Sequence, residues 1–298
     1  MLTLIAILVD GLVYSSWLFL VAVGLTLIFG VMKILNVTHG SLYAFGAYTA
    51  AWMIGLYFEA DWPAAGSFAV LAVAALVVGV VLGLVLERGL LRFMYGRDEV
   101  IIVLVTYAAF LVLEDVILLI WGTDPYFAFQ PYGLLGSSGL GVLLFANYDL
   151  SLVGVAVVLG AVMWWAINRT RWGLLLQAVI HDREMAQALG INVTLMFTLT
   201  FILGAILGAL GGAVTAPQIS VAPGIGVEVI VIAFAVVVVG GMGSIPGAAI
   251  GALSVGLIRA AAVHLLPQVE LFVIYAVMSL VLAVRPQGLF SRAEARKI

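Results

Sequence analysis

The segment IVLVTYAAFLVLEDVILLIW (Ile102–Trp121) is apolar along almost its whole length, and only Glu114 and Asp115 interrupt it with charge. Its length matches the roughly 20 residues that an α-helix needs to cross the hydrocarbon core of a bilayer. The apolar residues are continuous rather than alternating, which favours a helix over a strand of a membrane β-barrel. The segment therefore predicts a transmembrane helix.

Composition extends this prediction to the whole chain. The 298 residues are 65% hydrophobic and only 9% charged, whereas soluble domains carry about 25% charged residues. We expect residues 1–298 to form one all-α domain, a polytopic transmembrane bundle of eight to nine spans with glycine-broken segments. The lower count stays open because the seventh and eighth segments are short. The predicted segments are about 11–30, 36–58, 64–86, 100–121, 150–167, 194–215, 227–242, 247–263 and 268–284.

The basic residues predict an orientation, because cytoplasmic connections of membrane proteins are rich in Lys and Arg. Eleven of the 12 Lys and Arg residues fall in intervals that would share one side of the bundle, and the exception is Arg259. We expect the N-terminus outside and the tail 285–298 in the cytoplasm. The intervals expected to be cytoplasmic are those around Lys33, at 87–99, at 168–193, near 243–246 and at 285–298.

The longest polar interval is Asn168–Gly190, NRTRWGLLLQAVIHDREMAQALG. Its apolar residues recur at a spacing of three to four, which predicts short amphipathic helices at a membrane surface. Gly190 is expected to end the second of these helices. We interpret 168–193 as a cytoplasmic coupling loop for a soluble motor.

Two stretches break the helical pattern at membrane depth. One is Phe29–Gly46, which places polar residues in an apolar background, and the other is GGMGSIPG (Gly240–Gly247). Irregular backbone at this depth is tolerated only against protein or a water-filled cavity. Both breaks are therefore candidates for a gate or the lining of a translocation path, and short turns between spans are the alternative. The candidate residues are Asn36, His39, Gly40, Ser41, Gly240, Gly241, Gly243 and Ser244.

Charged residues within spans are costly and usually face the interior of the bundle. Glu114, Asp115, Glu228 and Arg259 are such residues. Each is a candidate substrate contact, although an interhelical pair or a snorkelling side chain would explain it equally. The outer interval 122–149 contains the apolar stretch LLGSSGLGVLLF. Part of this interval is expected to dip into the membrane or to lie flat on it. The interval as a whole is either an ordinary surface loop, or a lid or docking surface for an external partner.

Several chemistries can be set aside. The chain has no cysteine, and it lacks the glycine loop with Lys-Ser or Lys-Thr that binds ATP phosphates. No two histidines have metal-ligand spacing, and no large basic patch suggests nucleic acid. Ser244 and His264 could formally serve an intramembrane protease, but they are expected at opposite membrane faces. We therefore expect no cofactor, no metal and no catalytic activity in this chain alone.

Four blocks resemble the inner-membrane permeases of ABC importers for branched-chain amino acids and their relatives. They are GLTLIFGVMKILNVTHGSLYAFGAY (24–48), TRWGLLLQAVIHDREMAQALGINV (170–193), GGMGSIPGAAIGAL (240–253) and RPQGLF (285–290). ABC importer permeases carry a Glu-Ala-Ala, three residues, Gly pattern in the loop that grips the ATPase. Here Glu184 and Ala186 fit it, Met185 replaces the first Ala, and Gly190 fits its end. The resemblance implies ATPase coupling through Arg183, Glu184, Ala186 and Gly190.

The resemblance also implies an assembly in a bacterial inner membrane, surrounded by lipid. Two ATPase subunits would lie below a pair of permeases, and a solute-binding protein would deliver substrate from outside. The chain is similar to the shorter of the family's two permease subunits, so a related partner is expected, with a homodimer as the alternative. The implied substrate is a branched-chain amino acid or another amino acid, an amide or urea. An ion-coupled secondary transporter, which also places binding at broken helices, is the competing function.

Overall fold

The apolar segment that fixes the class of fold forms helix α4 (Glu99–Trp121). The Asp98 carboxylate accepts a hydrogen bond from the Val100 N–H at 2.9 Å and so caps the first turn. The computed structural model describes residues 2–140, 143–285 and 288–290. Within them, every predicted hydrophobic segment forms a helix, and six helices are long and apolar enough to cross a membrane.

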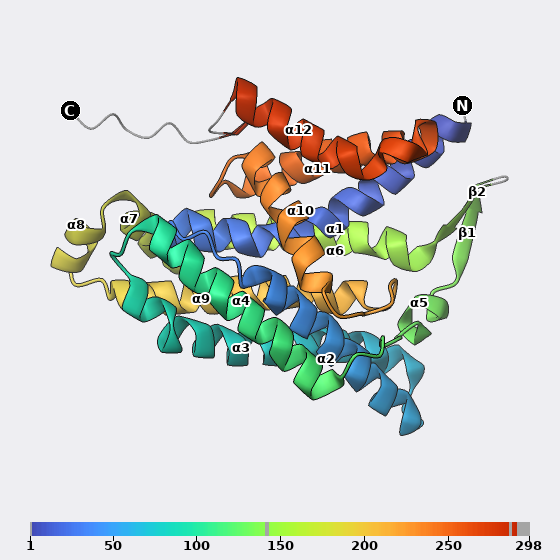
Figure 1. Ribbon diagram of the computed structural model, residues 1–298, viewed down its shortest axis with the longest axis horizontal. Coiled ribbons are helices and arrows are strands. Elements are labelled where there is room, and N and C mark those ends of the chain that lie inside the picture. The colour runs from blue at the N-terminus through green and yellow to red at the C-terminus, as the bar shows by residue number, and fades with distance from the viewer. Residues whose placement is uncertain (1, 141–142, 286–287, 291–298) are drawn as a thin grey trace.

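Most of the long helices run roughly along the long axis of the molecule, while α10 (Ile225–Gly240) crosses them steeply (Figure 1). Three turns of 3-10 helix lie at Ala64–Gly66, Leu91–Met94 and Pro267–Val269. The other long helices are α1 (Leu2–Met32), α2 (His39–Glu59), α3 (Ser67–Gly89), α6 (Asn147–Arg169), α9 (Val193–Thr215), α10 (Ile225–Gly240), α11 (Ile245–Leu265) and α12 (Glu270–Val284). The short elements are α5 (Gln130–Leu134), β1 (Ser137–Leu140), β2 (Leu143–Ala146), α7 (Arg171–His181) and α8 (Arg183–Ala188).

The two ends of the bundle differ in charge. Helices α7 and α8 lie at one end, and α5 with the β1–β2 hairpin lies at the other (Figure 1). The connections that share the α7–α8 end carry nearly all the cationic side chains of the described residues. These are Lys33, Arg88, Arg92, Arg97, Arg169, Arg171, Arg183 and Arg285. The basic intervals that the sequence predicted to share one side of the membrane therefore lie together at one end of the bundle.

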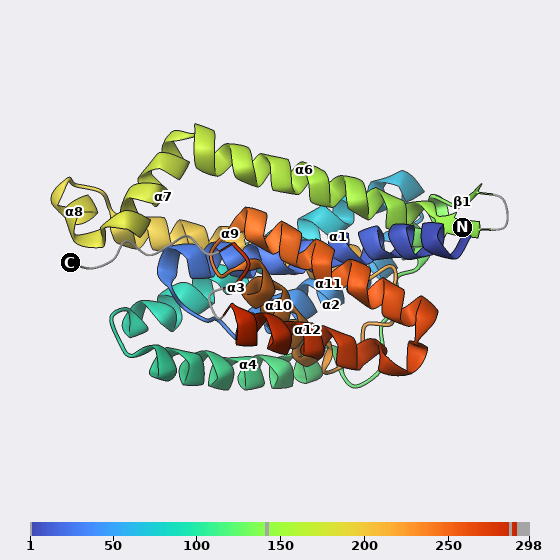
Figure 2. The same cartoon turned by 90° about the horizontal axis from the view of Figure 1, so that it is seen from above.

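The interior is built on close contact between helices α1, α2 and α9. A Cβ built on Gly46 of α2 would clash with the Ala209 carbonyl of α9, and one on Gly204 of α9 would clash with Ile28 of α1. Small residues let helix backbones approach closely. Such packing drives helix association within a bilayer, because lipid tails are as apolar as the helices and the hydrophobic effect contributes little there. Helices α4 and α6 instead lie on opposite outer sides of the bundle (Figure 2), and most of their residues are exposed. Apolar exposed faces of this kind suit contact with lipid.

Some sequence-based boundaries were wrong. Helix α1 begins at Leu2 rather than near residue 11, so Asp10 lies inside it. The outer interval ends at residue 146, because α6 begins at Asn147. The stretch LLGSSGLGVLLF contributes an antiparallel hairpin in which Ser137 pairs with Ala146. Most of the predicted tail 285–298 lies outside the described residues.

The two helix breaks are both connections between helices. In the first, α1 ends at Met32 and α2 begins at His39. In the second, α10 ends at Gly240 and α11 begins at Ile245, so GGMGSIPG is centred on a short turn. The Ser244 hydroxyl accepts a hydrogen bond from the Gly247 N–H at 3.1 Å and caps α11. The backbone of GGMGSIPG is therefore that of a short turn between two helices.

Candidate functional site

Helix α7 forms the first half of the predicted coupling loop. The Thr170 hydroxyl accepts a hydrogen bond from the Gly173 N–H at 3.2 Å and caps the helix. Leu176 and Val179 are buried against the bundle. Leu174, by contrast, is 61% exposed at the end of the molecule. The three-to-four spacing therefore predicted the buried face of this helix correctly, but its outer face is also largely apolar, with Leu174, Leu175 and Ile180 exposed.

Helix α8 follows after a single residue. The Asp182 carboxylate accepts a hydrogen bond from the Met185 N–H at 2.9 Å, so this acid caps α8. Glu184 is exposed, as are Met185 at 57% and Leu189 at 75%. Ala186 is buried and faces the bundle. The helix and its C-cap residue Leu189 thus present one carboxylate and two large apolar side chains outward.

Gly190 turns the chain away from α8. Its N–H donates to the Gln187 carbonyl at 2.9 Å, and the Ile191 N–H donates to the Ala186 carbonyl at 3.0 Å. This pair of bonds is the Schellman ending of a helix, which needs a left-handed residue. Gly190 has φ +85°, a value at which a side chain is strained. Ala186 and Gly190 therefore fix the shape of the loop, and Glu184 contributes an exposed carboxylate to it.

Arg183 connects α8 to the helices behind it. Its guanidinium lies 5.2 Å from the centre of the Phe197 ring in α9. Phe197 meets the Tyr95 ring edge to face, also at 5.2 Å between centres. The Tyr95 hydroxyl donates to Glu87 Oε1 of α3 at 2.7 Å, and Glu87 is fully buried. Burial first, and then the bond to Glu87, raises the pKa of Tyr95, so its hydroxyl keeps the proton.

The polar residues of the first break are enclosed by protein. Asn36, His39 and Ser41 are 0% exposed. One ring nitrogen of His39, Nε2, lies 2.9 Å from the Val21 carbonyl oxygen. Gly40 faces α10, because a Cβ on it would lie 2.5 Å from the Gly226 carbonyl oxygen.

The two breaks meet at the α7–α8 end of the bundle. A Cβ on Gly30 would lie 3.1 Å from both the Cα and the carbonyl oxygen of Gly243. The residues after α12 also contact the end of α10, where the Leu289 N–H donates a hydrogen bond to the Val239 carbonyl at 3.0 Å. Gly240 packs on Gly247 within the turn. We call the contact of Gly30 with Gly243 the glycine junction.

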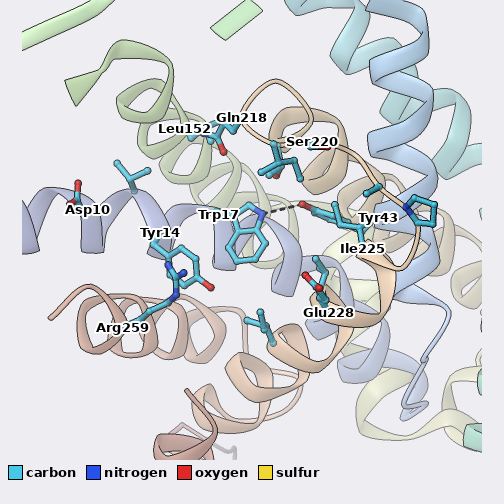
Figure 3. Close-up of a pocket in the computed structure, with 17 residues that line it drawn as sticks. Asp10, Tyr14, Trp17, Tyr43, Leu152, Gln218, Ser220, Ile225, Glu228 and Arg259 are labelled. Atoms are coloured by element: carbon cyan, nitrogen blue, oxygen red, sulfur yellow. Dashed lines mark hydrogen bonds between the residues drawn. The ribbon is translucent and has the colours of Figure 1, made fainter. Parts of the chain in front are cut away.

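A cavity of about 550 Å³ opens in the half of the bundle nearer the β1–β2 hairpin. Figure 3 shows its polar side chains converging from α1, α10, α11 and the α9–α10 connection. Its lining residues are Asp10, Val13, Tyr14, Trp17, Tyr43, Leu152, Thr215, Gln218, Ile219, Ser220, Ala222, Pro223, Ile225, Glu228, Val229, Ile232 and Arg259.

Most charged and aromatic groups of the cavity are already paired. The Arg259 guanidinium lies 3.9 Å from the centre of the Tyr14 ring and forms an ion pair with Glu270 of α12. The Trp17 indole N–H donates to the Tyr43 hydroxyl at 3.4 Å. These contacts hold the aromatic wall in place. The cavity is therefore a preformed, mostly apolar site with a few placed polar groups, which is typical of small-molecule sites.

The structure separates the predicted site residues into three places. The predicted coupling residues Arg183, Glu184, Ala186 and Gly190 come together in α8 and the turn that ends it. The path or gate candidates lie in the two breaks, and none of them lines the cavity. Of the charged residues within spans, Glu228 and Arg259 line the cavity. Glu114 and Asp115 do not line it, and Glu114 Oε1 lies against Gly226 of α10.

Sequence reasoning missed Asp10, Tyr14 and Trp17 as cavity residues. Asp10 was placed before the first span, and the aromatic residues were treated as ordinary span residues. A signal was present, since polar and aromatic side chains cluster at DGLVYSSW, residues 10–17, in an otherwise apolar helix. Within the described part of the chain, no group of three or more His, Cys, Asp or Glu residues could hold a metal ion.

Comparison with known proteins places the chain in a family. Residues 7–282 match the model of the family described as branched-chain amino acid transport system, permease component. The chain is 30% identical to the permease protein BraD of a high-affinity branched-chain amino acid transport system of Pseudomonas aeruginosa, over 98% of this chain and 97% of that protein. It is 28% identical to the LivH permease proteins of Salmonella typhimurium and Escherichia coli, over 97% of this chain and 96% of each.

No solved structure matches the fold significantly. The matches in sequence nevertheless cover nearly the whole chain and agree with the helical bundle described above. The chain belongs to the family of permease components of branched-chain amino acid transport systems, and it is a non-catalytic, multi-pass membrane subunit of the ABC importer type.

Proposed function

We propose that this chain forms half of the pore of an ATP-driven importer of branched-chain amino acids, and that α7 and α8 dock on its ATPase. The observation that carries the proposal is the exposed face of α8, which presents Glu184, Met185 and Leu189 on a helix capped at both ends. A short amphipathic helix of this kind fits a groove on a partner protein. The chain has no nucleotide-binding loop of its own, so the energy must come from that partner.

The coupling follows from how α8 is attached. Closure of the ATPases would move α8 as a rigid body, because the bonds at Asp182 and Gly190 fix both its ends. Arg183, Phe197, Tyr95 and Glu87 would pass the movement to α9 and α3. Packed helices respond to such a displacement by shifting between discrete arrangements rather than by deforming continuously.

The path itself is proposed to use both groups of residues in the membrane. The cavity near the hairpin end would receive the amino acid from a solute-binding protein. The glycine junction at the other end, with Asn36, His39, Gly40 and Ser41 behind it, would act as the gate. Backbones in contact at Gly30 and Gly243 leave no side chain to obstruct a sliding movement. The second half of the pore would come from a related permease, or from a second copy of this chain.

The orientation is proposed from the distribution of charge. The α7–α8 end carries the arginines and would face the cytoplasm, where basic connections are retained. The α5 and hairpin end would face outward, toward the binding protein. The C-terminus and both ATPase subunits would then lie on the cytoplasmic side of a bacterial inner membrane.

The test is purification of the tagged chain from its native membrane, followed by identification of co-purifying proteins and an uptake assay. We expect a P-loop ATPase and a second permease in the complex. Leucine uptake in proteoliposomes should require ATP and binding protein and should survive an uncoupler. A chain that purifies alone, with uptake that an uncoupler abolishes, would instead identify an ion-coupled carrier.

A further inference from the structure

We propose that the Glu228 carboxylate binds the ammonium group of the transported amino acid inside the cavity. This inference rests on the proposed function, because it assumes that the cavity lies on the import path. Glu228 lies in the first turn of α10, and Figure 3 places its carboxylate at the cavity, across from Tyr14 and Trp17.

Glu228 differs from the other acids in and around the cavity because no described residue pairs with it. Asp10 lies 2.7 Å from His264 Nε2. Glu270 is paired with Arg259. Asp149, behind the lining residue Gln218, accepts a hydrogen bond from the Gln218 amide at 2.8 Å. Among the described residues, the salt bridges and hydrogen bonds of the chain include none to Glu228, which leaves its oxygens available to a ligand.

Glu228 lies close to the N-terminus of α10, and its side chain is exposed at the cavity. The N-terminal turn of a helix carries partial positive charge, which stabilises a negative side chain. The lining residues nearest to it on α10 are the aliphatic Ile225, Val229 and Ile232, so a cation that enters here gains most from the opposite charge of Glu228. The one cationic side chain of the lining, Arg259, is neutralised by Glu270. The cavity therefore selects for a positively charged group at Glu228.

The rest of the cavity suits a branched aliphatic side chain. Val13, Leu152, Ile225 and Val229 supply aliphatic surface, and the Trp17 ring is held by Tyr43. A cavity of about 550 Å³ is wide enough for a small amino acid. The ligand class is thus a small molecule with an ammonium group at one end and an aliphatic chain at the other.

The first experiment uses the complete importer in proteoliposomes with its binding protein, and compares Glu228→Gln, Glu228→Asp and wild type. We expect Glu228→Gln to lower kcat/KM for leucine uptake by at least about tenfold, the effect of losing a charge-assisted bond. Glu228→Asp should recover part of the loss. Glu59→Gln is the matched control, since Glu59 is exposed at the same end of the bundle and does not line the cavity. Equal uptake by wild type and Glu228→Gln would overturn the inference and leave the proposed function standing. A wild-type importer without ATP-driven leucine uptake would overturn the proposed function.

The second experiment removes the binding protein, so that selectivity of the cavity itself is measured. Ligands are added to the importer complex while Trp17 fluorescence is followed, with Trp17→Phe as the reference for the other tryptophans. Leucine and 3-methylbutylamine, which keep the ammonium group, should change the signal at lower concentration than 4-methylpentanoate, which lacks it. Glu228→Gln should remove that difference. Equal responses to the amine and the acid in wild type would contradict the assignment.

Discussion

The Arg183 guanidinium stacks over the Phe197 ring at 5.2 Å, and this contact joins the exposed helix α8 directly to the buried helix α9. Phe197 is only 5% exposed. Helix α8 needs such an anchor to keep its position, since its own six residues are too few to be stable alone. The anchor is planar and cationic, a geometry that Arg supplies and Lys does not.

The stack predicts energetic coupling between the two residues. A cation–π contact near the surface contributes about 0.5–1 kcal/mol. In a double-mutant cycle with Arg183→Ala and Phe197→Leu, we expect a coupling energy of that size in thermal unfolding of the purified complex. Each single variant should also lower the amount of substrate transported per ATP hydrolysed. Strictly additive effects on both measurements would show that α8 is not held by this contact.

We expect substitution of Glu184 to have a different effect, because its side chain is exposed and takes no part in the contact of Arg183 with Phe197. We expect Glu184→Arg to insert and fold normally, since exposed substitutions of this kind change stability by less than about 0.5 kcal/mol. Transport should nevertheless fall, because reversed charge on the docking face opposes the register with the ATPase. The measurements are ATPase co-purification and the ratio of uptake to hydrolysis, with Glu59→Arg at the opposite end as control. Normal values for both would remove Glu184 from the docking surface.

Two glycines of α2 provide a matched test of the packing. A Cβ on Gly46 would clash with the Ala209 carbonyl of α9, whereas a Cβ on Gly55 would meet nothing within 4 Å. Gly46→Ala should therefore destabilise the bundle by about 1–3 kcal/mol, the usual cost of overpacking. Gly55→Ala should be neutral or stabilising by up to about 1 kcal/mol. Thermal unfolding of the two variants in the same detergent checks the prediction, and shifts of equal sign and size would contradict it.

The helices of the bundle and the two short helices of 168–193 could be predicted because their signals are local. Continuous apolar runs gave α4 and its counterparts, and the spacing of Leu176 and Val179 gave the buried face of α7. Gly190 was recognised as a helix end because left-handed backbone favours glycine at that position. The start of α1 was misplaced because Asp10 was read as the edge of an apolar segment, while in the structure its partner His264 lies on α11.

The cavity and the glycine junction could not be predicted from one sequence. Each is formed by residues that are far apart in the chain, as Tyr14 and Arg259 are in the cavity. Gly30 and Gly243 likewise meet only because α1 packs against the α10–α11 turn. Periodicity specifies which face of a helix is apolar, but the choice of neighbour depends on shape complementarity between whole helix surfaces. Glu228 could therefore be identified as unusual, while its place in the cavity required the fold.

The distribution of charge predicts the topology, which reporter fusions can measure at four connections. Fusions after Asp61 and Tyr132, which lie at the hairpin end, should report the outside. Fusions after Arg97 and Arg183, which lie at the basic end, should report the cytoplasm, because Lys and Arg near span ends are retained there. Replacing Arg88, Arg92 and Arg97 together by Gln should weaken the cytoplasmic signal of the α3–α4 connection, and replacing acidic residues at the other end should have little effect. The opposite pattern of reporters in the unaltered chain would place α8 outside the cell, where no ATPase could reach it, and the coupling role of the loop would have to be abandoned.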